Sequence, residues 1–369
     1  MLVISHKPCW RDDKHLVTTG GFPRHISALR LVDPALTLAV PISPTTSDQP
    51  SSPLDSDLDF VDLGEVPPSN WRYLGKWCRL MVRLLRLVRS SHHVHVLGPS
   101  SVSLLAILAA WATLTPMSSR YCGVWGHGRS FAERTVQQLL AIHARFGGVV
   151  FATGVEPDVP VGNLRWIFST SLWEHELVEL APDKDRELHT PVRLGCLQRL
   201  VSSKRTEIAI EAVQMLAATG LPITLVVMGD GPQRHELEAL AQRRSASVEF
   251  TGQLRREAAV ERLCTLDVLV FPSESEGFPK AVSEAQACGI AVVAATDSGL
   301  ERIVNTAGVL ADPTAESFAR AIEQLIGDPE RYRLASKAGI ALAQRRSLET
   351  WAAIIADALG RPLATRSVT

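Results

Sequence analysis

The sequence predicts an α/β protein built from two doubly wound domains, and three observations lead to this fold class. The chain has 369 residues, which is more than a single hydrophobic core usually holds. Short apolar runs in its C-terminal half alternate with segments of helical periodicity. Those runs lack polar alternation, which is typical of parallel strands that are buried on both faces of a sheet.

The C-terminal half has the clearest alternation of predicted strands and helices. Five apolar runs predict strands, at 192–196, 223–228, 248–250, 268–271 and 290–294. Helices are expected between them at about 206–218, 233–244 and 256–264, and from Pro279 onward. A further helix at 347–359 follows after this domain is complete. The alternation predicts a parallel sheet with a ligand site at the carboxyl ends of its strands.

The N-terminal half repeats this alternation less regularly. Short strands are expected at 2–5, 36–40, 60–63 and 94–97, and a helix at 23–32 follows Gly20-Gly21. The apolar run 102–114 predicts a buried helix, because it is shorter than the roughly 17 to 25 residues that a spanning helix needs. Polarity rises over 183–190, so the expected domains are 1–187 and 188–346, with 347–369 as a C-terminal helix and tail.

Charge and composition exclude several classes of protein. The chain has 38 Lys and Arg against 39 Asp and Glu, a balance that is not typical of a nucleic-acid binder. An apolar fraction of 46% excludes a disordered chain. Residues 1–5 are apolar but have no basic region before them, which argues against a secretory signal and predicts a cytoplasmic location.

Neither the cysteines nor the histidines show the spacing of a metal site. The six cysteines stand singly without a CxxC pair, which is typical of a reducing interior and argues against a disulfide scaffold or structural zinc. They are Cys9, Cys78, Cys122, Cys196, Cys264 and Cys288. His92, His93 and His95 surround a predicted strand but lack a further ligand at metal spacing, so no metal is expected.

Two glutamates follow the predicted strand 268–271. Glu276 lies just before Pro279, a residue suited to the first turn of a helix, and Glu284 lies about a turn and a half inside that helix. Ionised carboxylates accept hydrogen bonds, which suits them to the vicinal hydroxyls of a sugar. Taken alone, the pair permits another interpretation, in which Glu276 is solvated and Glu284 pairs with Lys280.

Two cations follow the predicted strand 192–196. Arg199 and Lys204 precede the expected helix at 206–218, where positive charge opposes the helix dipole. In one interpretation, a bound diphosphate makes the position of these cations favourable. In the other, Arg199 and Lys204 are ordinary surface cations. The stretch Gly229-Asp230-Gly231-Pro232 is by itself only a turn.

Taken together, the order of these residues resembles the retaining glycosyltransferases of family 4. The pattern consists of Arg199 and Lys204, Gly229-Asp230-Gly231-Pro232, Glu276-Gly277-Phe278-Pro279, Glu284 and Gly299-Leu300-Glu301, within about 192–359. Its most specific part is the two glutamates with seven residues between them. The resemblance implies the GT-B fold, in which two Rossmann-like domains face a central cleft and the C-terminal domain binds a nucleotide sugar. The last helix of that fold crosses back to the N-terminal domain.

The resemblance also implies roles for individual charged residues. Arg199 and Lys204 would neutralise the diphosphate of the donor. Glu284 would hold the ribose hydroxyls, and Glu276 would meet the hydroxyls of the donor sugar. Glu276 is therefore a candidate catalytic residue.

Further implied contacts involve glycine-rich loops. The backbone amides of Gly277 and Phe278 would complete the cradle for phosphate and sugar. Gly20-Gly21 is similar to the family's glycine-rich loop beside the acceptor and phosphates, and Trp125-Gly126-His127-Gly128 resembles its histidine-glycine loop. His127 is thus the second catalytic candidate. The Asn-Gly-Val-Asp segment that precedes the linker in this family is not recognisable here.

The resemblance predicts a retaining, metal-independent glycosyltransferase of the hexosyltransferase type. Its donor would be a UDP-, GDP- or ADP-linked sugar, its acceptor a hydroxyl of a glycan, glycolipid or small molecule, and no cofactor is expected. Two alternatives stay open: a catalytically inactive GT-B protein that binds a nucleotide sugar, and a nucleotide-sugar 2-epimerase. A nicotinamide dehydrogenase is disfavoured because no GxGxxG follows a predicted strand.

Residues 71–89 contain six cations and no acid. Lys and Arg recur there every three or four residues, which predicts a basic stripe along a helix whose remaining surface is apolar. Such a helix can lie on an anionic membrane surface, which predicts peripheral contact at the inner face of the membrane. It can equally be an ordinary helix of the domain with its arginines in solvent.

Overall fold

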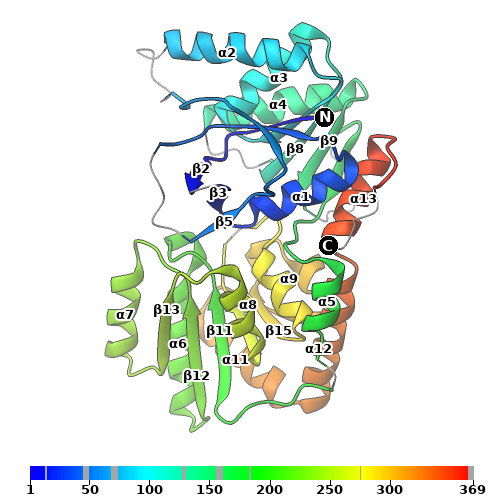
Figure 1. Ribbon diagram of the computed structural model, residues 1–369. Coiled ribbons are helices and arrows are strands. Elements are labelled where there is room, and N and C mark those ends of the chain that lie inside the picture. Colours follow the sequence, from blue (N-terminus) through cyan, green and yellow to red (C-terminus); the bar gives the residue numbers. More distant parts are fainter. Residues whose placement is uncertain are drawn as a thin grey trace. The chain divides into compact units, whose positions relative to one another are not determined.

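The computed structural model describes residues 1–12, 15–44, 50–67, 74–126, 130–154, 161–182, 184–274 and 276–364. The chain divides into two compact units (Figure 1). Unit 1 comprises Met1–Phe168 and Leu348–Thr369, and unit 2 comprises Ser169–Ser347. Each unit has its own parallel sheet with helices, so the predicted class of two Rossmann-like α/β domains is confirmed.

The main sheet of unit 1 has seven parallel strands in the order β10-β9-β8-β7-β1-β4-β6. All four residues of β1 (Leu2–Ser5) are buried, as expected for a central strand. The other strands are β4 (Thr37–Val40), β6 (Asp59–Asp62), β7 (Val94–Gly98), β8 (Met117–Val124), β9 (Val149–Thr153) and β10 (Leu164–Ile167). A smaller antiparallel sheet contains β2 (Trp10–Asp12), β3 (His15–Thr19) and β5 (Ser51–Pro53).

Helices cover the main sheet of unit 1. They are α1 (Phe22–Val32), α2 (Leu74–Arg89), α3 (Ser101–Thr113), α4 (Phe131–Arg145) and α13 (Leu348–Ala358). α3 starts at a capping box, in which the Ser103 amide donates to the Ser100 hydroxyl at 3.0 Å and the Ser100 amide donates to the Ser103 hydroxyl at 2.7 Å. Val102 and Ile107 are fully buried, so the apolar run 102–114 forms a core helix as predicted.

The last helix, α13, packs against α1 in unit 1. Trp351 of α13 has no exposed surface. Its ring lies 5.2 Å from the ring of His25, centroid to centroid, in an edge-on arrangement. The guanidinium of Arg120 lies 4.9 Å from the same indole. These contacts attach the C-terminal end of the chain to the sheet and the first helix of unit 1.

The sheet of unit 2 has six parallel strands in the order β13-β12-β11-β14-β15-β16. The chain builds outward from β11 on one side and then returns to build from β14 on the other, so the strand order reverses between these two neighbours. The strands are β11 (Val192–Leu197), β12 (Ile223–Met228), β13 (Val248–Gly252), β14 (Val268–Phe271), β15 (Ala291–Ala295) and β16 (Gly308–Ala311). Its helices are α5 (Glu174–Leu180), α6 (Thr206–Ala218), α7 (Arg234–Arg243), α8 (Arg256–Cys264), α9 (Lys280–Ala287), α10 (Glu301–Val304), α11 (Ala315–Ile326) and α12 (Pro329–Gln344).

The boundary between the units lies at Phe168 rather than at the expected residue 187. Leu172, which precedes α5, and Leu177, within α5, are both buried. They pack with Ala287 of α9 and Ala343 of α12. This apolar contact joins the segment 169–187 to unit 2. Of the polar stretch 183–190, the described residues 184–190 form a surface loop before β11, and the sequence gives no sign of the long-range contact that sets the boundary.

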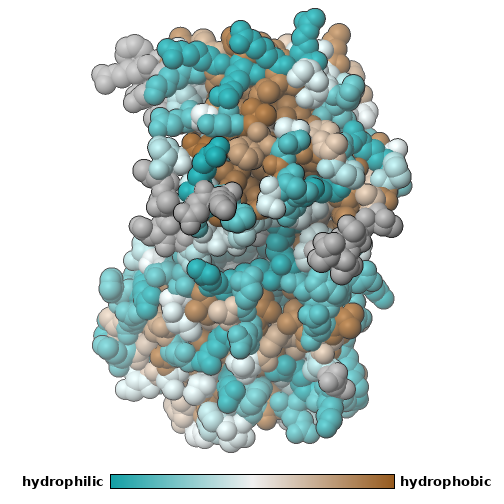
Figure 2. All heavy atoms as spheres, viewed as in Figure 1, coloured by the Kyte–Doolittle hydropathy of each residue, from teal (hydrophilic) through white to brown (hydrophobic). Residues whose placement is uncertain are grey.

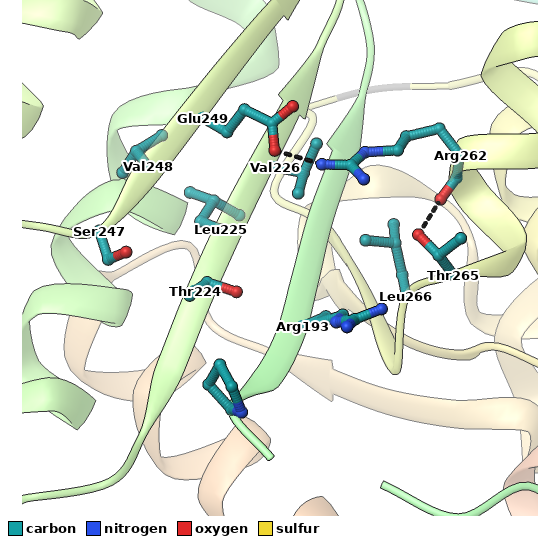
Figure 3. A pocket seen from close by; sticks show the side chains of 11 residues that line it. Arg193, Thr224, Leu225, Val226, Ser247, Val248, Glu249, Arg262, Thr265 and Leu266 are labelled. Carbon is teal, nitrogen blue, oxygen red and sulfur yellow. Dashed lines mark hydrogen bonds and ion pairs between the residues drawn. The ribbon is translucent and has the colours of Figure 1, made fainter. Parts of the chain in front are cut away.

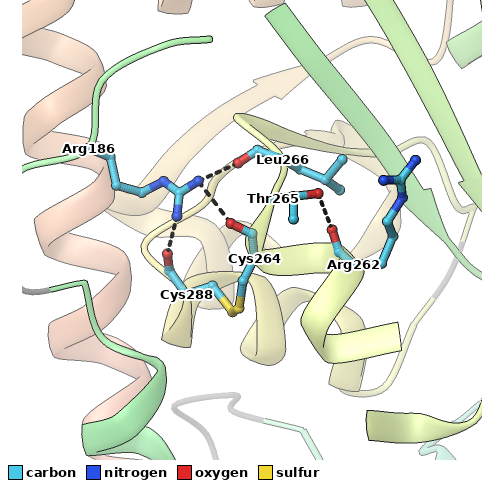
Figure 4. Close-up of a disulfide and its surroundings, with 6 residues drawn as sticks. All are labelled: Arg186, Arg262, Cys264, Thr265, Leu266 and Cys288. Carbon is cyan, nitrogen blue, oxygen red and sulfur yellow. Dashed lines mark hydrogen bonds between the residues drawn. A yellow bond between two sulfur atoms is a disulfide. The ribbon is translucent and has the colours of Figure 1, made fainter. Parts of the chain in front are cut away.

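One pair of cysteines contradicts the expectation of single reduced thiols. Cys264, at the end of α8, and Cys288, at the end of α9, form a disulfide with their Cα atoms 5.3 Å apart (Figure 4). The Arg186 guanidinium donates to the carbonyls of both cysteines, at 3.1 and 3.0 Å, and to that of Leu266. α8 and α9 pack together in the fold, which brings the two cysteines within bonding distance although 24 positions separate them.

We expect loss of this disulfide to lower the free energy of unfolding of unit 2 by about 3 kcal/mol, because the cross-link restricts the unfolded chain. Urea unfolding of the oxidised protein should be compared with that of the double variant Cys264→Ser/Cys288→Ser. Dithiothreitol should shift the wild-type transition to lower urea and leave the double variant unchanged. An unshifted wild-type transition after complete reduction, verified by thiol titration, would contradict the prediction.

Candidate active site

Two loops meet at the carboxyl edge of the sheet in unit 2. β11 and β14 are parallel neighbours, with Leu194 opposite Val268, so their carboxyl ends lie at the same edge. The loop after β11 passes through a 3-10 turn at Ser202–Lys204, and the loop after β14 leads into α9. The Glu274 amide donates to the Ser203 carbonyl at 2.9 Å and joins the loops. They lie where the strand order reverses, which is the usual ligand site of such sheets.

The glycines of the turn after β12 are required by the close approach of two backbones. A Cβ atom on Gly229 would lie 2.0 Å from the carbonyl oxygen of Gln198, and one on Gly231 would lie 2.4 Å from that of Leu200. The Leu200 amide donates to the Asp230 carbonyl at 3.0 Å. The stretch 229–232 therefore supports the loop that carries Arg199 and Lys204.

Lys204 and Glu276 form an ion pair in this loop region. The Lys204 Nζ contacts Glu276 Oε1 and donates to Ser273 Oγ at 3.1 Å. Ser273 Oγ in turn donates to the same glutamate oxygen at 2.7 Å. Ser273 is fully buried, while the lysine and glutamate side chains are 18% and 17% exposed. The arrangement holds one cation and one carboxylate at the edge of the sheet, both accessible to a ligand.

The other predicted cation, Arg199, is exposed. Its neighbour in the loop, Arg205, is the arginine that makes ion pairs, with Asp297 at 2.7 Å and Glu274 at 4.0 Å. Arg205 has a left-handed backbone conformation with φ of 49°. This residue was not predicted from the sequence, although the available signal was an arginine next to Lys204 and an aspartate after β15.

Glu284, on α9, is 8% exposed and does not make the pair with Lys280 that the isolated-residue interpretation suggested. Its Oε1 accepts a hydrogen bond from the hydroxyl of Ser171, which is 3% exposed. The sequence reasoning missed Ser171. It lies at the junction where the family's Asn-Gly-Val-Asp segment could not be recognised.

Gly277 and Phe278 lie in the loop before α9, whose N-cap is Pro279. The Phe278 ring is buried and faces the Arg346 guanidinium at 5.3 Å from its centroid. Burial lowers the pKa of Arg346. This contact fixes the loop at the start of α9, where unsatisfied backbone amides and the helix dipole favour an anion.

The N-terminal candidates lie in unit 1. Gly20 has φ of 72°, and Gly21 is the N-cap of α1, with its carbonyl accepting from His25 Nδ1 at 2.9 Å. His127 and its neighbour Gly128 lie outside the described residues. In the described parts of the chain, no group of three or more His, Cys, Asp or Glu side chains could hold a metal ion.

A cavity of about 440 Å³ lies elsewhere in unit 2 (Figure 3). Its lining includes Arg193, Thr224 and Val248, which are at the amino ends of β11, β12 and β13. Glu249 and Arg262 form an ion pair in its wall. The cavity is therefore at the opposite end of the strands from Lys204, Glu276 and Glu284.

Residues 179–341 match the sequence model of the family described as Glycosyl transferases group 1. The match lies wholly within unit 2 and includes the loops after β11, β12 and β14. The match covers less than half of the chain, and we refer to residues 179–341 as the group 1 domain because of it. The group 1 domain contains Lys204, Glu276 and Glu284, whereas Ser171 precedes it.

Two curated relatives match part of the chain. The GDP-mannose-dependent alpha-(1-6)-phosphatidylinositol dimannoside mannosyltransferase of Mycobacterium tuberculosis is 33% identical over 146 residues, 39% of this chain and 38% of that protein. The GDP-mannose-dependent alpha-mannosyltransferase of Mycolicibacterium smegmatis is 28% identical over 260 residues, 69% of this chain and 60% of that protein. The chain thus covers less than two thirds of the length of either relative.

A solved structure extends the similarity in fold to nearly the whole chain. Anabaena Alr3699/HepE in complex with UDP matches with a TM-score of 0.73 at 15% identity, over 97% of this chain and 99% of that one. At this identity the match establishes the fold alone. The GT-B fold implied by the sequence resemblance is confirmed, with the group 1 domain as its C-terminal half.

Proposed function

We propose that this protein is a retaining glycosyltransferase that moves a sugar from a nucleoside diphosphate to an acceptor hydroxyl. The observation that carries the proposal is the ion pair of Lys204 and Glu276 at the carboxyl edge of the sheet, within the group 1 domain that also contains the buried Glu284. A cation suited to a diphosphate and a carboxylate suited to hydroxyls lie on the two loops where a doubly wound sheet binds its ligand, and a second carboxylate follows on α9.

In this proposal, different charged residues contact different parts of the donor. Lys204 and Arg199 neutralise the diphosphate, and the amides of Gly277 and Phe278 add the positive end of α9. Glu276 accepts from the sugar hydroxyls through lone pairs that Lys204 and Ser273 leave available. Glu284 accepts from the ribose. Because the two relatives above are named GDP-mannose-dependent, GDP-mannose is the first donor to test, followed by UDP- and ADP-sugars.

Departure of the diphosphate is the step that these residues assist. Negative charge grows on the leaving phosphate, and preorganised cations and amides stabilise it there. The acceptor hydroxyl attacks from the same side of the sugar and passes its proton to a donor phosphate oxygen, so the anomeric configuration is retained. Gly20, Gly21 and His127 are proposed to contact the acceptor and the reacting carbon. The mechanism as proposed uses no metal or other cofactor.

The test is turnover with a panel of nucleotide sugars, measured as release of the nucleoside diphosphate with and without acceptors. Acceptor-dependent release and an NMR spectrum of the product with the donor's anomeric configuration would support the proposal. Inversion would reject the retaining mechanism. Conversion of the donor sugar without any acceptor would indicate a 2-epimerase, and binding without turnover would indicate an inactive nucleotide-sugar binder.

The outer face of α2 suits an anionic lipid surface. Leu80, Leu84 and Val88 are buried on its inner face. Arg79, Arg83 and Arg86 are exposed, and hydrophilic side chains gather over this helix at the top of the view in Figure 2. The outer face also has a groove of about 540 Å³, lined by Cys78, Arg79, Val82, Arg83 and Arg86. Among the described residues, no helix is long and apolar enough to span a bilayer.

We propose that α2 holds the enzyme at an anionic membrane surface. Arg79→Ala/Arg83→Ala/Arg86→Ala should reduce binding to vesicles of phosphatidylglycerol and phosphatidylcholine by about 100-fold at low salt, because each basic side chain near such a surface contributes about 1 kcal/mol. Co-sedimentation measures the bound fraction. The matched control, Arg243→Ala/Arg320→Ala/Arg331→Ala, removes three exposed arginines of unit 2 and should bind like wild type. Wild-type protein that stays in the supernatant would reject the membrane contact.

A further inference from the structure

Glu284 is held by a residue outside the group 1 match. Ser171 and Glu284 are 113 positions apart in sequence, and the serine hydroxyl donates to Glu284 Oε1. Both side chains are buried, at 3% and 8% exposure. A carboxylate withdrawn from water in this way is costly unless hydrogen bonds satisfy it. Ser171 supplies such a bond, and bonds to a charged acceptor are stronger than those between neutral groups.

The hydrogen bond from Ser171 gives the two carboxylate oxygens of Glu284 different roles. Within the described residues, the hydrogen bond to Glu284 is made at Oε1. Oε2 is then the oxygen available to accept from hydroxyls of a ligand. Because the Ser171 bond fixes the plane of the carboxylate, it also fixes the direction in which Oε2 presents its lone pairs.

The backbone of Ser171 is itself held by Arg256. Its carbonyl accepts from Arg256 Nη2 at 3.3 Å, and Arg256 Nη1 pairs with Glu176 at 3.3 Å. The other oxygen of Glu176 accepts from the Trp173 amide at 2.8 Å, at the start of α5. This network joins the start of α8 to the turn that carries Ser171. The Ser171 hydroxyl therefore bonds to Glu284 from a backbone segment that other contacts already hold in position.

We propose that Ser171 is a positioning residue for the donor. Its hydroxyl fixes Oε1 of Glu284 so that Oε2 accepts the ribose hydroxyls of the nucleoside diphosphate. The inference rests on the proposed function, since it takes Glu284 to be the ribose ligand. It makes the segment 169–173, which belongs to unit 2, part of the machinery of donor binding.

The test compares binding of GDP and UDP with binding of their 2′,3′-dideoxy analogues by isothermal titration calorimetry, using whichever base binds more tightly. Ser171→Ala should weaken the ribonucleotide about tenfold, in the range expected for loss of a hydrogen bond to a charged group, and change the dideoxy analogue less than twofold. Ser171→Thr should stay within about threefold of wild type, whereas Ser171→Val, of the same shape without the hydroxyl, should behave like the alanine variant.

Ser283→Ala is the matched control for this series. Ser283 adjoins Glu284, is 2% exposed and has a hydroxyl without a hydrogen-bond partner among the described residues, so its removal should leave the preference for ribose unchanged. The threonine and valine variants keep the comparison valid if the alanine variant folds poorly. The inference is overturned if Ser171→Val keeps the wild-type preference for ribose while Glu284→Gln loses it. If Glu284→Gln keeps that preference, the assignment of Glu284 in the proposed function is itself rejected.

Discussion

Lys204→Ala is expected to lower kcat/KM for sugar transfer by about 100- to 1,000-fold, the usual cost of removing one preorganised group that stabilises a developing negative charge. Lys204 Nζ is already held by Ser273 and Glu276, so it needs no rearrangement to meet a diphosphate. The substitution also leaves Glu276 without its cation next to the bound anion, which adds to the loss. Initial rates with GDP-mannose and with other nucleotide sugars measure the effect.

A control substitution at another lysine and a double variant test whether the loss of kcat/KM comes from the contact of Lys204 with the donor. Lys337→Ala removes a half-exposed lysine that pairs with Asp185 in the same unit, and it should leave kcat/KM unchanged within about twofold. In the double variant Lys204→Ala/Glu276→Gln, the loss should be smaller than the product of the two single effects, because the residues are in contact. A Lys204→Ala enzyme with wild-type kcat/KM would remove this lysine from the donor site.

Trp351→Ala is expected to lower the free energy of unfolding by about 3 to 5 kcal/mol, the range for truncating a large buried aromatic side chain. Trp351 has no exposed surface and contacts both His25 and Arg120. The substitution leaves a cavity between α13 and α1 and removes the indole that faces the buried guanidinium. Because the chain has two units, thermal unfolding should be followed by a probe of unit 1 as well as by total ellipticity.

Asp357→Ala is the control on the same helix. Asp357 is 83% exposed and its ion pair with Arg165 is 3.5 Å long, so its loss should have little effect on stability. If Trp351→Ala unfolds at the same temperature as Asp357→Ala, α13 does not contribute the packing described for unit 1.

The elements that the sequence predicted best are those whose residue pattern fits one type of secondary structure. The run 223–228 is apolar at every position except Thr224 and ends at a glycine turn, and β12 occupies those residues. The expected helix at 256–264 coincides with α8. In unit 1, by contrast, β8 (Met117–Val124) was not predicted, because Ser118, Ser119 and Arg120 interrupt its apolar pattern although all three are buried.

Part of the candidate site could be predicted and part could not. Lys204, Glu276 and Glu284 were identified because each follows a strand and their order matches a known pattern. The contact between Lys204 and Glu276 spans 72 positions, and that between Ser171 and Glu284 spans 113. No local pattern reports such pairs, because a serine before a helix is common and its partner is decided by how the helices pack.

The sequence by itself determined the α/β class and the strand-end position of the charged residues. These features depend on local periodicity and on backbone conformation, which neighbouring residues set. Only the tertiary structure decided where unit 2 begins, which cysteines meet and which hydroxyl holds Glu284. Each of those depends on the packing of segments far apart in the chain, where the free energy comes from burial and from hydrogen bonds that form only once both partners are in place.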